Sequence, residues 1–207
     1  MTKIKICGLY RPCDVEYVNR AEPDWCGFVI NFPKSHRSVT PEQARELRAG
    51  LSRRVRPVGV FVDRPPEEVS ALLDDGTLAA AQLHGHEDDA YIARLRSLTR
   101  GHPMWSGYEI WKAFKIRTAA DLDAANASAA DLVLLDNGYG TGETFDWSLT
   151  GGIKRPFLLA GGLTPDNIPD AIRQLHPYGL DISSGVETAK KKDLNKILAA
   201  VAAARKE

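Results

Sequence analysis

The chain has 207 residues, of which 43% are hydrophobic, and its 27 basic side chains are balanced by 27 acidic ones. A zero net charge gives no general attraction to nucleic acid or to a membrane surface, so a small-molecule partner is favoured over both. No apolar run reaches the roughly 18 to 20 residues of a membrane span, and the first residues are strand-like and charged, unlike a signal peptide. The three cysteines lack metal-type spacing. We therefore expect a cytoplasmic, globular protein with one domain over residues 1–207.

Short apolar runs alternate with amphipathic stretches along the whole chain. Two of the amphipathic stretches have clear helix starts, because Thr40 precedes Pro41 and Thr164 precedes Pro165, a cap residue followed by a proline suited to the first helical position. The apolar runs predict strands over residues 4–7, 25–30, 57–62, 79–84, 110–116, 132–136, 157–162 and 179–184.

Strict alternation of strands and helices favours parallel strands joined by right-handed crossovers. Eight such units are the number that closes a (β/α)8 barrel. The alternative is an open doubly wound sheet, but its usual GxGxxG signature is missing from "CGLYRPCD", which follows the first run. We therefore predict the α/β class, as one (β/α)8 TIM barrel of parallel strands.

In this fold the active site lies at the carboxyl ends of the strands, so the residues that end each run are the candidates. Most of them are polar, although Asp63 and Asn31 are also ordinary turn formers. His84 either contacts a substrate or is a satisfied core histidine. The run-ending residues are Cys7, Asn31, Asp63, His84, Lys115, Asp136, Gly161, Gly162, Ser183 and Ser184.

The first run, "KIKIC", alternates apolar and polar residues. If Ile4 and Ile6 pack against the helices, Lys5 and Cys7 point into the barrel. A buried ammonium needs a counter-charge, and the last strand, which neighbours the first once the barrel closes, offers Asp181. We predict a Lys5–Asp181 ion pair. The alternative leaves the lysines in solvent and makes Cys7 a small buried hydrophobe.

Asp136 ends the most apolar run and begins a loop over residues 137–147. Desolvation can raise the pKa of such a carboxyl group toward that of a general acid, although turn-forming aspartates are common. The loop contains Gly138, Gly140 and Gly142 and is either a mobile lid or an ordinary surface loop.

Two glycine-containing segments predict a phosphate site. They are "AGGLTPDN" and "ISSGVE", and their backbone N–H groups can form the phosphate cradle that is usual after the last two strands of this fold. Arg37, in "FPKSHRSVT", follows the second strand on a loop at the same end, where its guanidinium could bind a carboxylate. Most loop arginines are only solvated.

Together, seven segments resemble the phosphoribosylanthranilate isomerases of tryptophan biosynthesis. They are "KICGL", "GFVINFPKSHRSVT", "VGVFVD", "QLHGHE", "LLDNGYGTGETFDW", "LAGGLTPDN" and "DISSGVE". The resemblance implies a barrel with neither metal nor organic cofactor. It also implies an Amadori rearrangement of N-(5'-phosphoribosyl)anthranilate to 1-(2-carboxyphenylamino)-1-deoxyribulose 5-phosphate.

The same resemblance implies that Cys7 is the general base, that Asp136 is the general acid and that Arg37 meets the anthranilate carboxylate. Four departures from the usual pattern are His36 in place of proline, Tyr139 in place of glycine, Tyr10 in place of threonine, and a seemingly shorter segment after Glu187. The full predicted substrate-binding set is Arg37, His84, Gly161, Gly162, Asp181, Ser183, Ser184 and Gly185.

Two alternatives remain at this stage. One is another phosphate-binding barrel enzyme acting on a sugar phosphate, such as indole-glycerol-phosphate synthase, which uses lysines, or a pentulose-phosphate epimerase, which needs metal ligands. The other is a non-catalytic phosphate-binding barrel. The Cys7 and Asp136 pair would be idle in all of these.

Overall fold

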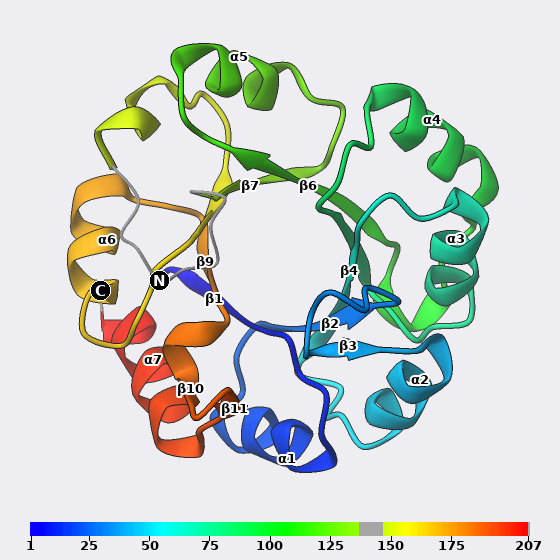
Figure 1. Cartoon of the computed structure of the whole chain (residues 1–207), viewed down its shortest axis with the longest axis horizontal. Coiled ribbons are helices and arrows are strands. Elements are labelled where there is room, and N and C mark those ends of the chain that lie inside the picture. Colours follow the sequence, from blue (N-terminus) through cyan, green and yellow to red (C-terminus); the bar gives the residue numbers. More distant parts are fainter. Residues whose placement is uncertain (137–146, 207) are drawn as a thin grey trace.

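A closed barrel of parallel strands forms the centre of the molecule (Figure 1), a computed structural model that describes residues 1–136 and 147–206. Eight of the nine strands in the main sheet close the barrel, because β1 pairs with both β9 and β2. The ninth, β3 (Ser38–Val39), lies outside β2. The barrel strands are β1 (Lys3–Cys7), β2 (Trp25–Ile30), β4 (Arg56–Phe61), β5 (Ala80–Leu83), β6 (Glu109–Lys115), β7 (Leu132–Asp136), β8 (Phe157–Ala160) and β9 (Gly179–Ile182).

Helices surround the barrel as an outer ring (Figure 1). The α-helices are α1 (Pro12–Ala21), α2 (Pro41–Ala49), α3 (Pro66–Asp74), α4 (Asp89–Leu98), α5 (Ala119–Ala127), α6 (Ile168–Leu175) and α7 (Leu194–Lys206). Between β7 and β8 the place of an α-helix is taken by a 3-10 helix, η2 (Trp147–Gly152). The predicted (β/α)8 barrel is therefore confirmed. Among the described residues, none of the helices has the length and apolarity needed to cross a membrane.

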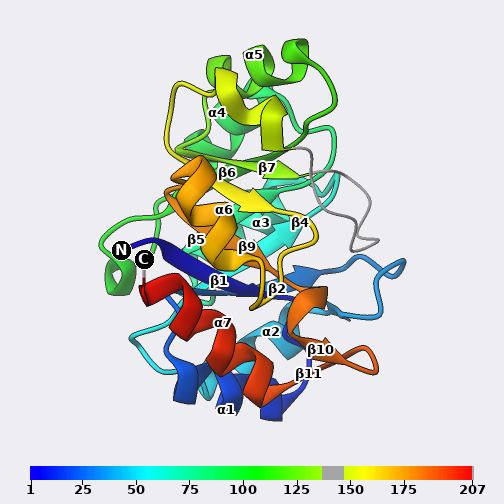
Figure 2. The ribbon, with the colours of Figure 1, turned by 90° about the vertical axis from the view of Figure 1, so that its left-hand side faces the viewer.

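The strands run toward one end of the barrel, which we call the mouth. Figure 2 shows that the segment after β2 and a small hairpin project at this end, whereas both chain termini lie at the other. The hairpin consists of β10 (Glu187–Thr188) and β11 (Lys191–Lys192), whose antiparallel register places Glu187 opposite Lys192. It lies between β9 and α7, directly after a short 3-10 helix, η3 (Ser184–Val186).

The two predicted helix starts have different outcomes. Thr40 caps α2 as predicted, since its hydroxyl accepts a hydrogen bond from the Gln43 N–H at 3.2 Å. The prediction for Thr164 is wrong, because α6 begins at Ile168 with Asn167 at the cap position. A helix starting at residue 165 would need a hydrogen bond from Pro169, which has no N–H, so residues 164–167 instead form a turn.

The strand faces are arranged as the alternation of β1 predicts. Ile4 and Ile6 are fully buried in the large core between the strands and the helices, whereas Lys5 is fully buried on the other face, inside the barrel. The barrel interior below it is filled by a separate cluster that includes Trp25 and Trp111, whose rings meet edge to face at a centroid distance of 5.2 Å. The barrel is thus closed below its mouth.

Candidate active site

The mouth contains a cavity of about 190 Å³ between the carboxyl ends of the strands. Its walls come from seven of the eight barrel strands or the residues that follow them, so side chains far apart in sequence meet there. Of the residues predicted from the sequence, the cavity is lined by Cys7, His84, Asp136, Gly161, Gly162, Asp181, Ser183 and Ser184.

Lys5 lies beneath the cavity lining, in a network of buried polar groups. Its ammonium is 3.0 Å from Asp181 Oδ2, and the two residues are direct partners in the β1–β9 register. The predicted ion pair is therefore confirmed. The same ammonium donates to Gln82 Oε1 at 2.7 Å and to Cys7 Sγ at 3.2 Å.

The sequence reasoning missed Gln82 and Gly27. The sequence did contain a signal for Gln82. This polar residue lies within the apolar run over residues 79–84, two positions before His84, so both side chains point to the same face of the strand. Gly27 lies beside Cys7 in the β1–β2 register, and a Cβ at this position would be 2.7 Å from the Cys7 sulfur. The absence of a side chain at Gly27 therefore makes room for the thiol.

The electrostatics of the network keep Cys7 protonated at rest. Burial raises the pKa of the Cys7 thiol, the Asp181 carboxylate raises it further, and the Lys5 ammonium only partly opposes them. Burial would lower the pKa of Lys5, but Asp181 and Cys7 outweigh burial, so the pKa of Lys5 is raised. Asp181 thus offsets the charge that would otherwise ionise the thiol.

We expect the Lys5–Asp181 pair to be strongly coupled. Lys5→Met or Asp181→Leu alone should lower the free energy of unfolding by about 3 to 5 kcal/mol, because each leaves a buried charge unpaired, whereas the double variant should lose much less. Urea unfolding of the four proteins measures the coupling. The matched control is Arg56–Glu109, whose side chains are each 34% exposed and whose coupling should not exceed about 1 kcal/mol. Additive effects at Lys5 and Asp181 would contradict this.

Asp136 lies at the carboxyl end of β7, and its Oδ2 is 3.4 Å from His84 Nε2. The Nδ1 of His84 is 3.2 Å from the amide nitrogen of Gln82. His84 therefore links Asp136 to the Lys5 network through Gln82. The raised pKa of Asp136 stays a prediction, and Gly138, Tyr139, Gly140 and Gly142 of the predicted lid lie outside the described residues.

The two glycine segments meet at the part of the cavity wall that follows β8 and β9, between Asp136 on β7 and Cys7 on β1. Gly161 and Gly162 have φ values of 92° and 64°, in the left-handed region that favours glycine. A Cβ at Gly185 would lie 1.8 Å from the carbonyl oxygen of Leu163, so the segments after β8 and β9 contact each other through their backbones. This brings the backbone of both segments close to the space that a ligand would occupy.

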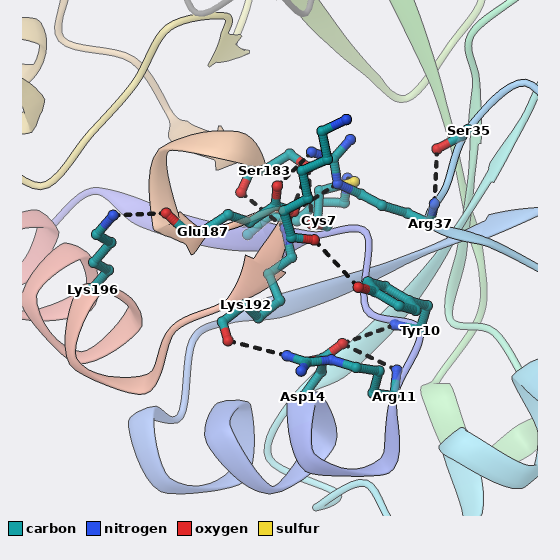
Figure 3. Close-up of polar contacts among 12 residues, drawn as sticks. Cys7, Tyr10, Arg11, Asp14, Ser35, Arg37, Ser183, Glu187, Lys192 and Lys196 are labelled. Atoms are coloured by element: carbon teal, nitrogen blue, oxygen red, sulfur yellow. Dashed lines mark hydrogen bonds and ion pairs between the residues drawn. The ribbon is translucent and has the colours of Figure 1, made fainter.

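Arg37 lies at the rim of the mouth and is not part of the cavity lining. Its Nε and Nη2 each lie 2.7 Å from a carboxylate oxygen of Glu187. Lys192 donates to the same carboxylate at 2.7 Å and to the Ser183 carbonyl at 2.9 Å. Figure 3 shows these side chains converging between the segment after β2, the β10–β11 hairpin and Cys7.

Two of the departures from the family pattern contact each other at this rim. The rings of Tyr10 and His36 meet edge to face, with centroids 6.0 Å apart, and the Tyr10 hydroxyl donates to the carbonyl oxygen of Lys190 in the hairpin turn at 3.2 Å. The unusual residues thus join the segment after β2 to the hairpin. Among the described residues, no group of three side chains suited to hold a metal ion occurs.

Comparison with known proteins gives a consistent result. The family model for N-(5'phosphoribosyl)anthranilate (PRA) isomerase matches residues 4–203. The N-(5'-phosphoribosyl)anthranilate isomerase of Endomicrobium trichonymphae is 41% identical over 206 residues, with 97% of each chain covered. That of Caldanaerobacter subterraneus is 39% identical over 204 residues, with 95% of each chain covered.

Solved structures agree with the sequence comparisons. The crystal structure of phosphoribosyl anthranilate isomerase from Thermotoga maritima superimposes with a TM-score of 0.84 at 33% identity, over 100% of both chains. A second structure, of phosphoribosyl anthranilate isomerase in complex with reduced 1-(o-carboxyphenylamino)-1-deoxyribulose 5-phosphate, has a TM-score of 0.82 at 31% identity over 100% of both chains.

Proposed function

The chain belongs to the N-(5'-phosphoribosyl)anthranilate isomerase family, and on this premise we propose that it rearranges N-(5'-phosphoribosyl)anthranilate to 1-(2-carboxyphenylamino)-1-deoxyribulose 5-phosphate in tryptophan biosynthesis. The observation that carries the proposal is that Cys7 and Asp136, from different strands, line one cavity together with the glycine segments. An acid, a base and an anion cradle are the parts that an aldose-to-ketose rearrangement of a sugar phosphate requires.

The first step is opening of the ribose ring. Asp136, as the carboxylic acid, protonates the ring oxygen, and the C1'–O bond breaks as the anilino nitrogen forms a Schiff base with C1'. The carboxyl group becomes a carboxylate. The Nε2 of His84 lies 3.4 Å from Asp136 Oδ2, so this side chain is placed to interact with that carboxylate.

The second step is removal of the C2' proton. Cys7, as the thiolate, takes this proton and leaves an enolamine, which tautomerises to the ketone by protonation at C1'. The Lys5 ammonium, 3.2 Å from the sulfur, stabilises the thiolate while it exists. The raised pKa of Cys7 makes this thiolate uncommon at rest but a stronger base once formed. Each proton transfer contributes a rate factor of about 10² to 10⁴.

The substrate phosphate is proposed to bind residues 161–163 and 183–185. Backbone N–H groups supply the contacts, so the shape of the main chain matters more than the serine hydroxyls. Asp181, which lines the same cavity, is proposed to face the ribose hydroxyls. The balanced charge of the chain supports a small-molecule partner over nucleic acid or a membrane surface, and its free cysteines support a cytoplasmic site of action.

Replacement of Gly162 by valine should weaken inhibition by inorganic phosphate by about tenfold or more, since a β-branched residue is strained at φ 64° and blocks the approach to the backbone. Ser184→Ala should weaken it less, because the main-chain contacts remain. Inhibition constants and urea midpoints measured together separate binding from misfolding. Phosphate bound at the loops after β4 and β5 in a crystal would refute this placement.

The cellular function is tested by complementation. A bacterial strain that lacks its own phosphoribosylanthranilate isomerase should grow without tryptophan when it expresses this chain. A known isomerase expressed from the same vector is the positive control. Failure of this chain to support growth, with the folded protein present in the cell extract, would count against the proposal.

A further inference from the structure

Glu187 occupies only one side of the Arg37 guanidinium. Its two oxygens contact Nε and Nη2, which form one of the two forks of this planar group. The other fork, made of Nη1 and Nη2, has hydrogens of its own to donate. The Arg37 side chain is 21% exposed at the rim of the mouth, so a ligand can reach it from solvent.

The position of Arg37 is close to the reacting thiol. A Cβ at Gly8, the residue after Cys7, would lie 2.4 Å from Arg37 Cδ and 3.4 Å from its Nε. The side chain therefore crosses directly over the backbone that carries Cys7. The backbone N–H of Arg37 donates a hydrogen bond to the Ser35 hydroxyl at 3.2 Å, as Figure 3 shows.

Glu187 is itself held firmly as a carboxylate. Its side chain is 6% exposed, and Lys192, whose side chain is fully buried, donates to it at 2.7 Å. Burial alone would raise the pKa of Glu187, but hydrogen bonds from Arg37 and Lys192 outweigh burial and lower it to about 2. Lys192 also bonds the Ser183 carbonyl, so the arrangement is tied to the end of β9.

The charges of this group favour an anion. Arg37 and Lys192 are two cations that share one carboxylate, so the three side chains together have one uncompensated positive charge. Lys196 donates to the Glu187 carbonyl oxygen at 2.7 Å, and its ammonium is offset by the nearby Asp193 carboxylate. A carboxylate bound to the second fork of Arg37 would compensate the excess charge, and a bidentate guanidinium–carboxylate pair is a strong interaction.

We propose that Glu187, held by Lys192, is a positioning residue that orients Arg37 so that its second fork binds the carboxylate of the substrate's aromatic ring. The proposal rests on the proposed function, because that function supplies a substrate with a ring carboxylate. Glu187 thereby determines selectivity for carboxylated over uncarboxylated anilino sugar phosphates without contacting the substrate.

The test compares steady-state kinetics of Glu187→Gln with a matched control, Glu109→Gln, which removes the charge of another arginine partner at the opposite end of the barrel. Glu187→Gln should raise KM by about tenfold with a much smaller change in kcat, as expected for lost binding. The control should leave KM unchanged. Glu187→Gln/Lys192→Gln, which leaves no buried ammonium unpaired, should show the same rise in KM if the single variant folds poorly.

The effect must also pass through Arg37. In an Arg37→Ala background, Glu187→Gln should produce no further rise in KM, because there is no guanidinium left to orient. An unchanged KM for Glu187→Gln in the wild-type background, or an equal rise with and without Arg37, would overturn the proposal.

Direct binding separates this inference from the proposed function. Calorimetry with two reduced product analogues, one with and one without the ring carboxylate, requires no turnover. Glu187→Gln should weaken only the carboxylated analogue. The wild-type protein could bind the carboxylated analogue more tightly than the uncarboxylated one, and lose this preference in Glu187→Gln, without turning over phosphoribosylanthranilate. In that case the proposed function fails and the inference about Glu187 stands. If both analogues weaken equally, the inference fails and the function is unaffected.

Discussion

Replacement of Cys7 by alanine is expected to lower kcat by at least about 100-fold, the lower limit for loss of a general base. The fold should survive, because Lys5 keeps two of its three side-chain partners, Asp181 and Gln82, when the sulfur is removed. The side chain is also small, and the site is already open at Gly27. Steady-state kinetics combined with urea unfolding separates the chemical effect from any loss of stability.

Cys26 provides the matched control for this variant. It is a fully buried thiol on the neighbouring strand β2, but it faces the core beneath the helices instead of the mouth. Burial raises the pKa of Cys26 to about 12, and its position in the core keeps this thiol away from a substrate at the mouth. Cys26→Ala should therefore reduce stability with little effect on kcat. Near-wild-type turnover by Cys7→Ala would exclude Cys7 as the base.

Replacement of Asp136 by asparagine is expected to reduce kcat by a comparable factor, at least about 100-fold, since an amide cannot protonate the ring oxygen. The side chain is nearly isosteric, so the position next to His84 should be kept. Binding of a reduced product analogue should change much less than kcat, because the analogue does not need the proton transfer.

Asp63 is the control for the acid. It lies just after a strand, β4, but its carboxylate accepts a hydrogen bond from the backbone N–H of His86 at 2.6 Å and is 3.0 Å from the His86 ring, so it organises a turn. Asp63→Asn should retain most of the activity. If Asp136→Asn stays active while Asp63→Asn or Asp181→Asn is inactive, the acid has been assigned to the wrong residue.

The barrel and the floor of its cavity were predictable because they follow from regular geometry. In a strand, side chains alternate between two faces, and closure of the barrel fixes which strands are neighbours. These two rules together predict the Lys5–Asp181 pair across 176 residues of sequence. The convergence of Cys7, His84 and Asp136 follows from the same geometry, because each lies at or just after the carboxyl end of a strand.

The rim of the mouth was not predictable in the same way. The pairing of Arg37 with Glu187 depends on an irregular segment after β2 and on a hairpin of two-residue strands, where no period relates sequence to side-chain direction. The start of α6 was predicted at the wrong residue for a similar local reason, since a single proline, Pro169, overrides the helix-start signal at Thr164. Gly27 carries no side chain, so only its position beside Cys7 reveals its role.

The most direct test of the central claim, that this chain is a phosphoribosylanthranilate isomerase, is a fluorescence assay with freshly prepared phosphoribosylanthranilate. Purified protein should accelerate the loss of substrate fluorescence in proportion to its concentration, without added metal or organic cofactor, and the product should be the 1-deoxyribulose 5-phosphate. A rate equal to the spontaneous decay of the substrate would contradict the claim, once a urea titration has shown that the protein used is folded.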